Sequence, residues 1–189
     1  MRFALAGSQS WRRSLAWWRE RPPTADRPGA FRVDRHEVDV AVPPETSADA
    51  VFERVRERLF EYRHFPTSIL RAKVDTDDGR VREGCLVVQR AYVPLVPIAL
   101  EAGVRVTGIR DRDEESGREA GVGIVTLDGH PEIGRERFAV RLDRASGRVT
   151  FTIDVESRPG PLLVRFARPI SRWFQLRATR ALLRSVAGS

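Results

Sequence analysis

The sequence of 189 residues has very little cysteine, methionine or lysine, with one residue of each. A lone cysteine, Cys85, excludes an internal disulfide and is typical of a reducing compartment. Its apolar surroundings favour a buried small side chain over a catalytic thiol. No apolar run approaches the roughly eighteen residues of a membrane-spanning helix, and the apolar segment 3–6 is too short for a signal peptide. We therefore expect a cytoplasmic protein of bacterial type.

Several chemical motifs are also missing. The three histidines, His36, His64 and His130, do not have the spacing of metal ligands. The sequence has no glycine-rich phosphate loop and no nucleophile elbow. We therefore predict no metal and no cofactor, and no reaction can be assigned from motifs.

The net charge of +7 is unevenly distributed. Residues 1–35 carry +5, residues 36–157 carry −5 and residues 158–189 carry +7. The sequence thus predicts a mildly acidic body with two basic ends. Such ends are usually solvated, with an anionic membrane surface as the second interpretation. Nucleic acid is the weakest candidate because no base-reading motif accompanies the charge.

The N-terminal segment predicts a short amphipathic helix capped by Ser10, with Trp11, Leu15 and Trp18 on one face and arginines around it. Such a helix either docks on the body, which we favour, or lies in a membrane interface, which would make the protein peripheral at the membrane. Residues 22–30 have the composition of a linker. The predicted organisation is a basic, tryptophan-rich extension and linker over 1–30 and one domain over 31–189.

The remaining sequence alternates in ways that predict regular structure. A first strand is expected from His36 to Val42 and a helix from Val51 to Tyr62, with Thr46 as its cap. Short apolar runs then predict strands near 67–75, 84–93, 101–110, 118–127, 135–143 and 148–157. Short connections between successive strands favour an antiparallel meander. Beyond 159–161, an apolar stripe predicts a helix to about residue 187, kinked at Pro169.

This order of elements predicts an α+β protein. One strand, one helix, six more strands and a long terminal helix match the START-like, helix-grip arrangement. In that arrangement a curved, seven-stranded antiparallel sheet wraps around the C-terminal helix. The connection between the fifth and sixth strands contains the most distinctive motif, TLDGHPEIGRERF, over residues 126–138. Asp128-Gly129 favours a turn there, and Gly134 is a candidate for a positive φ.

The motif resembles that of the family known as Domain of Unknown Function 1990, whose pattern is YGTLPGHPE-x-GEE-x-F followed by (A/S)-x-SRP. The matching positions in the turn are Thr126, Leu127, Gly129, His130, Pro131, Glu132, Gly134, Glu136 and Phe138, and those in the later segment are Ser157, Arg158 and Pro159. The family tends to have tyrosine, glycine and proline at positions 124, 125 and 128. The resemblance covers about residues 30–187 and implies a START-like fold without an established reaction.

His130 could act as a general base oriented by Glu132, which would make the protein a small-molecule enzyme. A histidine in a Gly-His-Pro turn more often holds the loop through backbone hydrogen bonds, so we favour a structural role.

The function that we predict is binding of a small, largely apolar or amphipathic molecule between the sheet and the C-terminal helix. The alternatives are a peripheral membrane or lipid-handling protein and an enzyme. The expected polar contacts are His130, Glu132 and Arg158, and the expected apolar lining is Phe138, Val140, Phe151, Ile153, Ile170 and Phe174.

Overall fold

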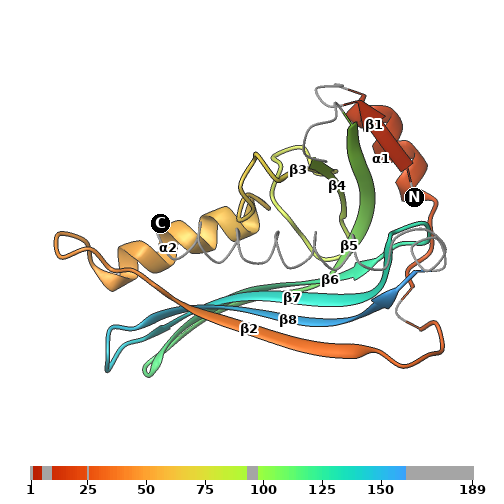
Figure 1. Ribbon diagram of the computed structural model, residues 1–189. Coiled ribbons are helices and arrows are strands. Elements are labelled where there is room, and N and C mark those ends of the chain that lie inside the picture. Colours follow the sequence, from red (N-terminus) through yellow and green to blue (C-terminus); the bar gives the residue numbers. More distant parts are fainter. Residues whose placement is uncertain (1, 6–9, 25, 93–97, 161–189) are drawn as a thin grey trace.

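A computed structural model describes residues 2–5, 10–24, 26–92 and 98–160. Two helices and eight strands are described (Figure 1). Their bounds are β1 (Arg2–Leu5), α1 (Trp11–Arg19), β2 (Arg32–Val40), α2 (Ala48–Phe60), β3 (Leu70–Val74), β4 (Leu86–Tyr92), β5 (Ile98–Glu114), β6 (Gly117–Thr126), β7 (Glu132–Asp143) and β8 (Val149–Pro159).

The strands form one curved antiparallel sheet in the order β2-β8-β7-β6-β5-β4-β3. This order confirms the predicted meander, with the first predicted strand closing on the last. The unpredicted strand β1 pairs with β5 at the end that β6 does not reach. A register shift in β5 between Val106 and Gly108 introduces a bulge. Because a bulge bends its strand, it contributes to the curvature visible in Figure 1.

The inner face of the sheet carries most of the hydrophobic core. Residues two apart on a strand share a face, and paired rows such as Phe151 with Val140 and Ile153 with Phe138 therefore point the same way. Helix α2 lies over part of this face (Figure 1) and buries one apolar side. Its buried members are Val51, Phe52, Val55, Leu59 and Phe60. The 3.6-residue spacing predicted this contact correctly.

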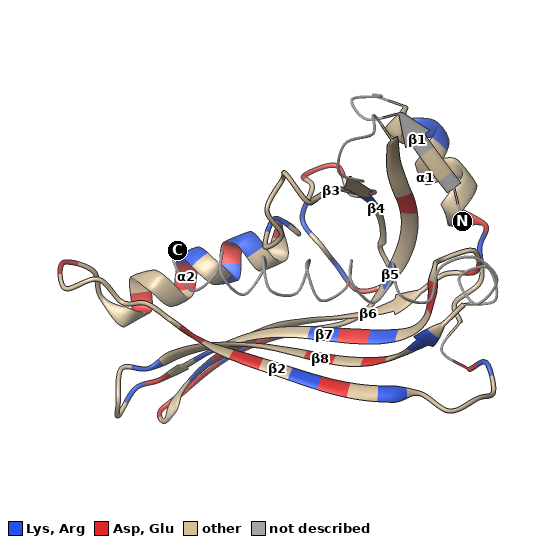
Figure 2. Ribbon diagram, viewed as in Figure 1, with Lys and Arg blue, Asp and Glu red and all other residues tan. Residues whose placement is uncertain are grey.

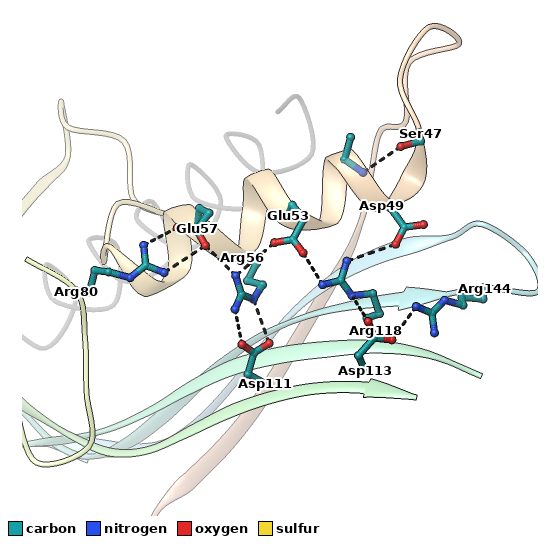
Figure 3. Close-up of polar contacts among 11 residues, drawn as sticks. Ser47, Asp49, Glu53, Arg56, Glu57, Arg80, Asp111, Asp113, Arg118 and Arg144 are labelled. Atoms are coloured by element: carbon teal, nitrogen blue, oxygen red, sulfur yellow. Dashed lines mark hydrogen bonds and ion pairs between the residues drawn. The ribbon is translucent and has the colours of Figure 1, made fainter. Parts of the chain in front are cut away.

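Helix α2 is held by its cap and by ion pairs to the sheet (Figure 3). The cap is Ser47, one residue later than predicted, and its hydroxyl accepts the Ala50 amide at 3.2 Å. Arg56 Nε donates to Asp111 on β5 at 3.0 Å. Arg118 on β6 pairs with Asp49 at 3.4 Å and with Glu53. These contacts fix the position of α2 along the sheet.

The outer face is polar over β2, β6, β7 and β8 and is covered by α1 over β4 and β5. Figure 2 shows acidic and basic residues along β2, β7 and β8. Glu119 there binds Arg137 at 2.5 Å and Arg141 at 3.0 Å. At the other end, Trp18 is fully buried beside Leu86 and Val88.

Helix α1 docks through a buried polar cluster on the outer face. Glu101, which is 1% exposed, accepts hydrogen bonds from Ser14 Oγ at 2.6 Å and from the Trp18 indole at 3.1 Å. Arg90 pairs with Glu101 at 3.1 Å and lies over the Trp11 ring at 3.9 Å. The tryptophan face therefore packs on the sheet, as the favoured interpretation predicted. Ser10 makes no side-chain cap bond.

Within the described part of the chain, no helix combines the length and apolar character needed to cross a membrane. The predicted C-terminal helix lies outside the described residues.

Candidate functional site

The turn between β6 and β7 is built by most of the motif residues. Thr126 Oγ accepts the Gly134 amide at 3.0 Å and lies 3.3 Å from the Gly134 carbonyl oxygen, so it holds the two sides of the turn together. Gly129 has a φ of 92°, a conformation that glycine adopts without steric cost. Gly134 does not have a positive φ, contrary to the prediction. A Cβ at that position would overlap the carbonyl oxygen of Glu156 on β8.

His130 closes the turn on itself. Its Nδ1 lies 3.0 Å from the Glu132 amide nitrogen and 2.9 Å from the Glu132 carbonyl oxygen. Burial lowers the pKa of His130 to about 4, so the ring is neutral at pH 7 and Nδ1 can accept the amide proton. Its bonds go to the backbone of Glu132, which is the geometry of a turn anchor rather than of a base oriented by a carboxylate.

The linker that follows α1 binds the start of the same turn through backbone and side-chain contacts. Thr24 Oγ lies 2.5 Å from Thr126 Oγ, and the Thr24 amide donates to the Thr126 carbonyl oxygen at 2.9 Å. Pro23 forms an isolated bridge with Leu127, and Arg27 pairs with Asp128 at 2.5 Å. Most residues of the motif therefore have a structural role: they connect β6 to β7 and bind the linker.

Arg158 lies away from the inner face. It pairs with Ile133 in the register of β7 and β8 and alternates with Ser157, so it points to the opposite side from Val155 and Ile153. Its guanidinium donates to the Pro28 carbonyl oxygen at 2.9 Å. The structure thus brings Arg158 to the linker and separates it from the apolar residues predicted with it.

The four predicted lining residues that the structure describes belong to the core. Phe138, Val140, Phe151 and Ile153 are at most 2% exposed and share one cluster with α2. The other two, Ile170 and Phe174, lie outside the described residues. Phe138 differs from the rest because its ring also packs on that of His64, in the segment after α2.

Glu136 is a polar motif residue that lies on β7, beyond the turn. It lies on the inner face of β7, between Ile124 of β6 and Val155 of β8. Burial among these neighbours raises the pKa of Glu136 from 4.5 to about 7. A carboxyl group on an apolar wall, divided between its two protonation states near neutral pH, is typical of functional sites.

Tyr62 faces Glu136 from the end of α2. It is 3% exposed and has a φ of 55°, a left-handed conformation that glycine or asparagine usually supplies after a helix. Its hydroxyl accepts the side-chain amide of Gln89 on β4 at 2.6 Å. Burial raises the pKa of Tyr62, and the charge of Glu136 adds to that rise. The left-handed backbone conformation of Tyr62, although unfavourable, thus places a neutral hydroxyl group on the inner face.

His64 completes the group, which we call the inner-face polar cluster: Tyr62, His64, Gln89 and Glu136. His64 is fully buried, and neither ring nitrogen has a hydrogen-bond partner within the part of the chain that the structure describes. Its ring packs on Tyr62 at 4.8 Å, on Phe65 at 4.6 Å and on Phe138 at 4.7 Å between centroids. Burial, with a smaller effect of Arg58, lowers the pKa of His64 to about 3.

The sequence gives a signal for three of these four residues. Glu136 was visible in the motif, and Tyr62 and His64 were polar residues next to a predicted helix end. Gln89, in contrast, stands in an apolar strand with no local signal. They are brought together by the sheet order β7-β6-β5-β4 and by the position of the end of α2, which no local pattern encodes.

The cluster suits hydrogen bonding more than metal binding. Among the described residues, no three histidine, cysteine, aspartate or glutamate side chains gather as a metal ion would require. With His64 neutral, Tyr62 neutral and Glu136 near its midpoint, the site offers donors and acceptors at little net charge. These groups can orient a polar atom of a molecule that is otherwise in contact with apolar side chains.

The sheet order and the inner-face helix define a START-like fold of the α+β class. The chain belongs to the family described as Domain of unknown function (DUF1990), whose model matches residues 19–185. The match includes α1's last residue and the linker that clamps the turn.

Two of the solved structures to which the chain is similar share its fold with a TM-score of 0.50 or more. A hypothetical protein from Helicobacter pylori is 12% identical with a TM-score of 0.57, covering 88% of this chain and 93% of that one. Ara h 8.0201 is 14% identical with a TM-score of 0.50, covering 84% and 96%. A START superfamily protein from Mycobacterium smegmatis is 14% identical with a TM-score of 0.47, covering 82% and 94%. A comparison with curated proteins gave no match.

Proposed function

We propose that the protein binds a small, largely apolar molecule against the inner face of the sheet, at the inner-face polar cluster. The predicted C-terminal helix would cover the molecule from the other side. Because one fold hosts many functions, the support for this function comes from the residues of the site.

The observation that supports it is Glu136, a carboxyl group set between Ile124 and Val155 and desolvated enough for its pKa to reach about 7. Keeping such a group on an apolar wall lowers stability, because above pH 7 its charge is poorly solvated. The neighbouring residues do not use it to build the turn. Ligand binding would explain why a carboxyl group stands on an apolar wall although it lowers the stability of the protein.

The two alternatives have less support. Membrane insertion through α1 would need a free tryptophan face, but Trp18 is buried on the sheet. Catalysis by His130 with Glu132 would need a free ring nitrogen facing a carboxylate, but Nδ1 is held by the Glu132 backbone.

A titration of the full chain with the neutral fluorescent probe N-phenyl-1-naphthylamine tests the proposal. We expect saturable binding of one probe per chain. Val155→Arg, which places a charge beside Glu136 on the inner face, should weaken binding at least tenfold. Asp154→Arg is the matched control, because it changes the next residue of β8 on the outer face and should bind normally.

Both variants must keep the wild-type circular dichroism spectrum. Absence of saturable binding, or equal binding by the wild type and Val155→Arg, would contradict the proposal.

A further inference from the structure

The imidazole of His64 is enclosed without hydrogen-bond partners. The side chain is fully buried, and both Nδ1 and Nε2 lack partners among the described residues. Three aromatic rings, those of Tyr62, Phe65 and Phe138, lie within 4.8 Å of it, centroid to centroid. Buried polar groups in folded proteins are almost always paired, so an imidazole with two free positions indicates a missing partner.

The chemistry of that partner follows from the state of the ring. Burial and Arg58 keep His64 neutral, so one nitrogen donates and the other accepts. A hydroxyl group can both donate and accept, and a carbonyl oxygen can satisfy the donating nitrogen.

The neighbouring groups disfavour a charged partner. Arg58, on α2, acts electrostatically on His64 and opposes a cation there. Glu136 is the next inward-facing residue of β7 before Phe138, about 7 Å along the strand, and opposes an anion when it is ionised. Tyr62, whose ring packs on that of His64, and Gln89 are neutral and bonded to each other at 2.6 Å. An uncharged group avoids both repulsions.

We infer that the bound molecule is a neutral amphiphile whose hydroxyl or carbonyl group bonds the imidazole of His64. Its apolar part then lies on the inner face near Ile124, Phe138 and Val155. This inference rests on the proposed function and adds the chemical class of the ligand to it.

A displacement series separates the inference from the proposal that supports it. N-phenyl-1-naphthylamine bound to the full chain is displaced at pH 7.5 with decane, 1-decanol, decanoate and decylammonium, which share one chain length. We expect 1-decanol to displace the probe at a concentration at least tenfold lower than the other three.

Two variants assign the preference to His64. His64→Leu should bind the probe but lose the preference for 1-decanol over decane. His64→Asn, which keeps one donor and one acceptor, should retain part of that preference.

The possible failures differ. If the probe does not bind, both the proposed function and this inference are wrong. Probe binding without a preference for 1-decanol, or with a preference kept in His64→Leu, overturns the inference alone. A preference for decylammonium or decanoate would show a charged ligand and would also overturn it.

Discussion

The ring of His64 packs against the ring of Phe138 at 4.7 Å between centroids. This contact joins the segment that follows α2 to the centre of β7, two residues from Glu136. It explains how polar side chains gather in the middle of an apolar face. The segment after α2 supplies Tyr62 and His64, and β7, distant in sequence, supplies Glu136 beside Phe138.

Glu136 should make stability depend on pH in an unusual direction. Its pKa is raised from 4.5 to about 7, so the folded state binds more protons than the unfolded state between these values. This contribution favours folding at low pH and is lost as pH rises through 7. Glu136→Gln should therefore raise the free energy of unfolding by up to about 3 kcal/mol at pH 8 and change it little at pH 4.5.

The measurement is urea unfolding of wild type and Glu136→Gln at both pH values. The difference between the two proteins isolates Glu136, because His64 and His130 contribute equally to each. A difference that is the same at pH 8 and pH 4.5 would show that Glu136 is solvated.

His130 should act on stability rather than on ligand binding. His130→Ala removes the acceptor of the Glu132 amide, and we expect a loss of about 1–3 kcal/mol in the free energy of unfolding. Because the pKa of His130 is lowered to about 4, the loss should be full above pH 6.5 and shrink as pH falls toward 4, where the wild type itself is destabilised.

Thermal and urea melts measure this effect, and the probe titration supplies the second readout. Normal melting combined with weakened probe binding would place His130 in the ligand site instead of the turn.

Helix α1 should stabilise the domain through Glu101. Glu101→Ala leaves the buried guanidinium of Arg90 without its carboxylate, which we expect to cost about 3–5 kcal/mol. Deletion of residues 1–21 should also lower the melting temperature, because it removes Ser14 and Trp18, which bond to the buried carboxylate of Glu101. Glu119→Ala, which removes a carboxylate on the outer face whose arginine partners are exposed, is the control and should cost about 1 kcal/mol or less.

Vesicle binding adds an independent readout for the N-terminal segment. If deletion of 1–21 abolishes binding to anionic vesicles and leaves the melting temperature unchanged, the helix is a membrane anchor and its docking is secondary.

Gly134 is required by close packing. A methyl group there would overlap the Glu156 carbonyl oxygen in the neighbouring strand, so Gly134→Ala should destabilise the protein by about 1–3 kcal/mol or more. Gly108→Ala is the matched control, since no atom lies within 4 Å of a Cβ built there. Equal melting temperatures for the two variants would contradict this explanation.

The sequence predicted the sheet well because alternation over six or more residues is a local signal. Strands β2 to β8 and α2 all lie where apolar periodicity indicated. Strand β1 was not predicted because its four residues, which pair with β5, show no recognisable alternation of apolar and polar side chains. The cap of α2 was displaced by one residue because Thr46 and Ser47 are both suitable caps, and only the backbone distinguishes them.

The site was harder to predict for a physical reason. The motif drew attention to His130, but the geometry uses this histidine, Thr126 and Gly134 to hold the turn. Gly134 needs space beside β8 rather than a positive φ, which depends on a partner strand distant in sequence. Arg158 is a similar case. Its position in the motif suggested a ligand contact, but its position along β8 places its side chain on the face away from the core, where it bonds to Pro28.

Native mass spectrometry of the purified full chain tests the central claim most directly. We predict a bound species of one mass, at one copy per chain, that is lost in Val155→Arg and retained in Asp154→Arg. Its fragmentation should show a largely apolar, uncharged molecule with a hydroxyl or carbonyl group. A chain that carries no such species, and that takes up no apolar molecule when one is supplied, would contradict the account.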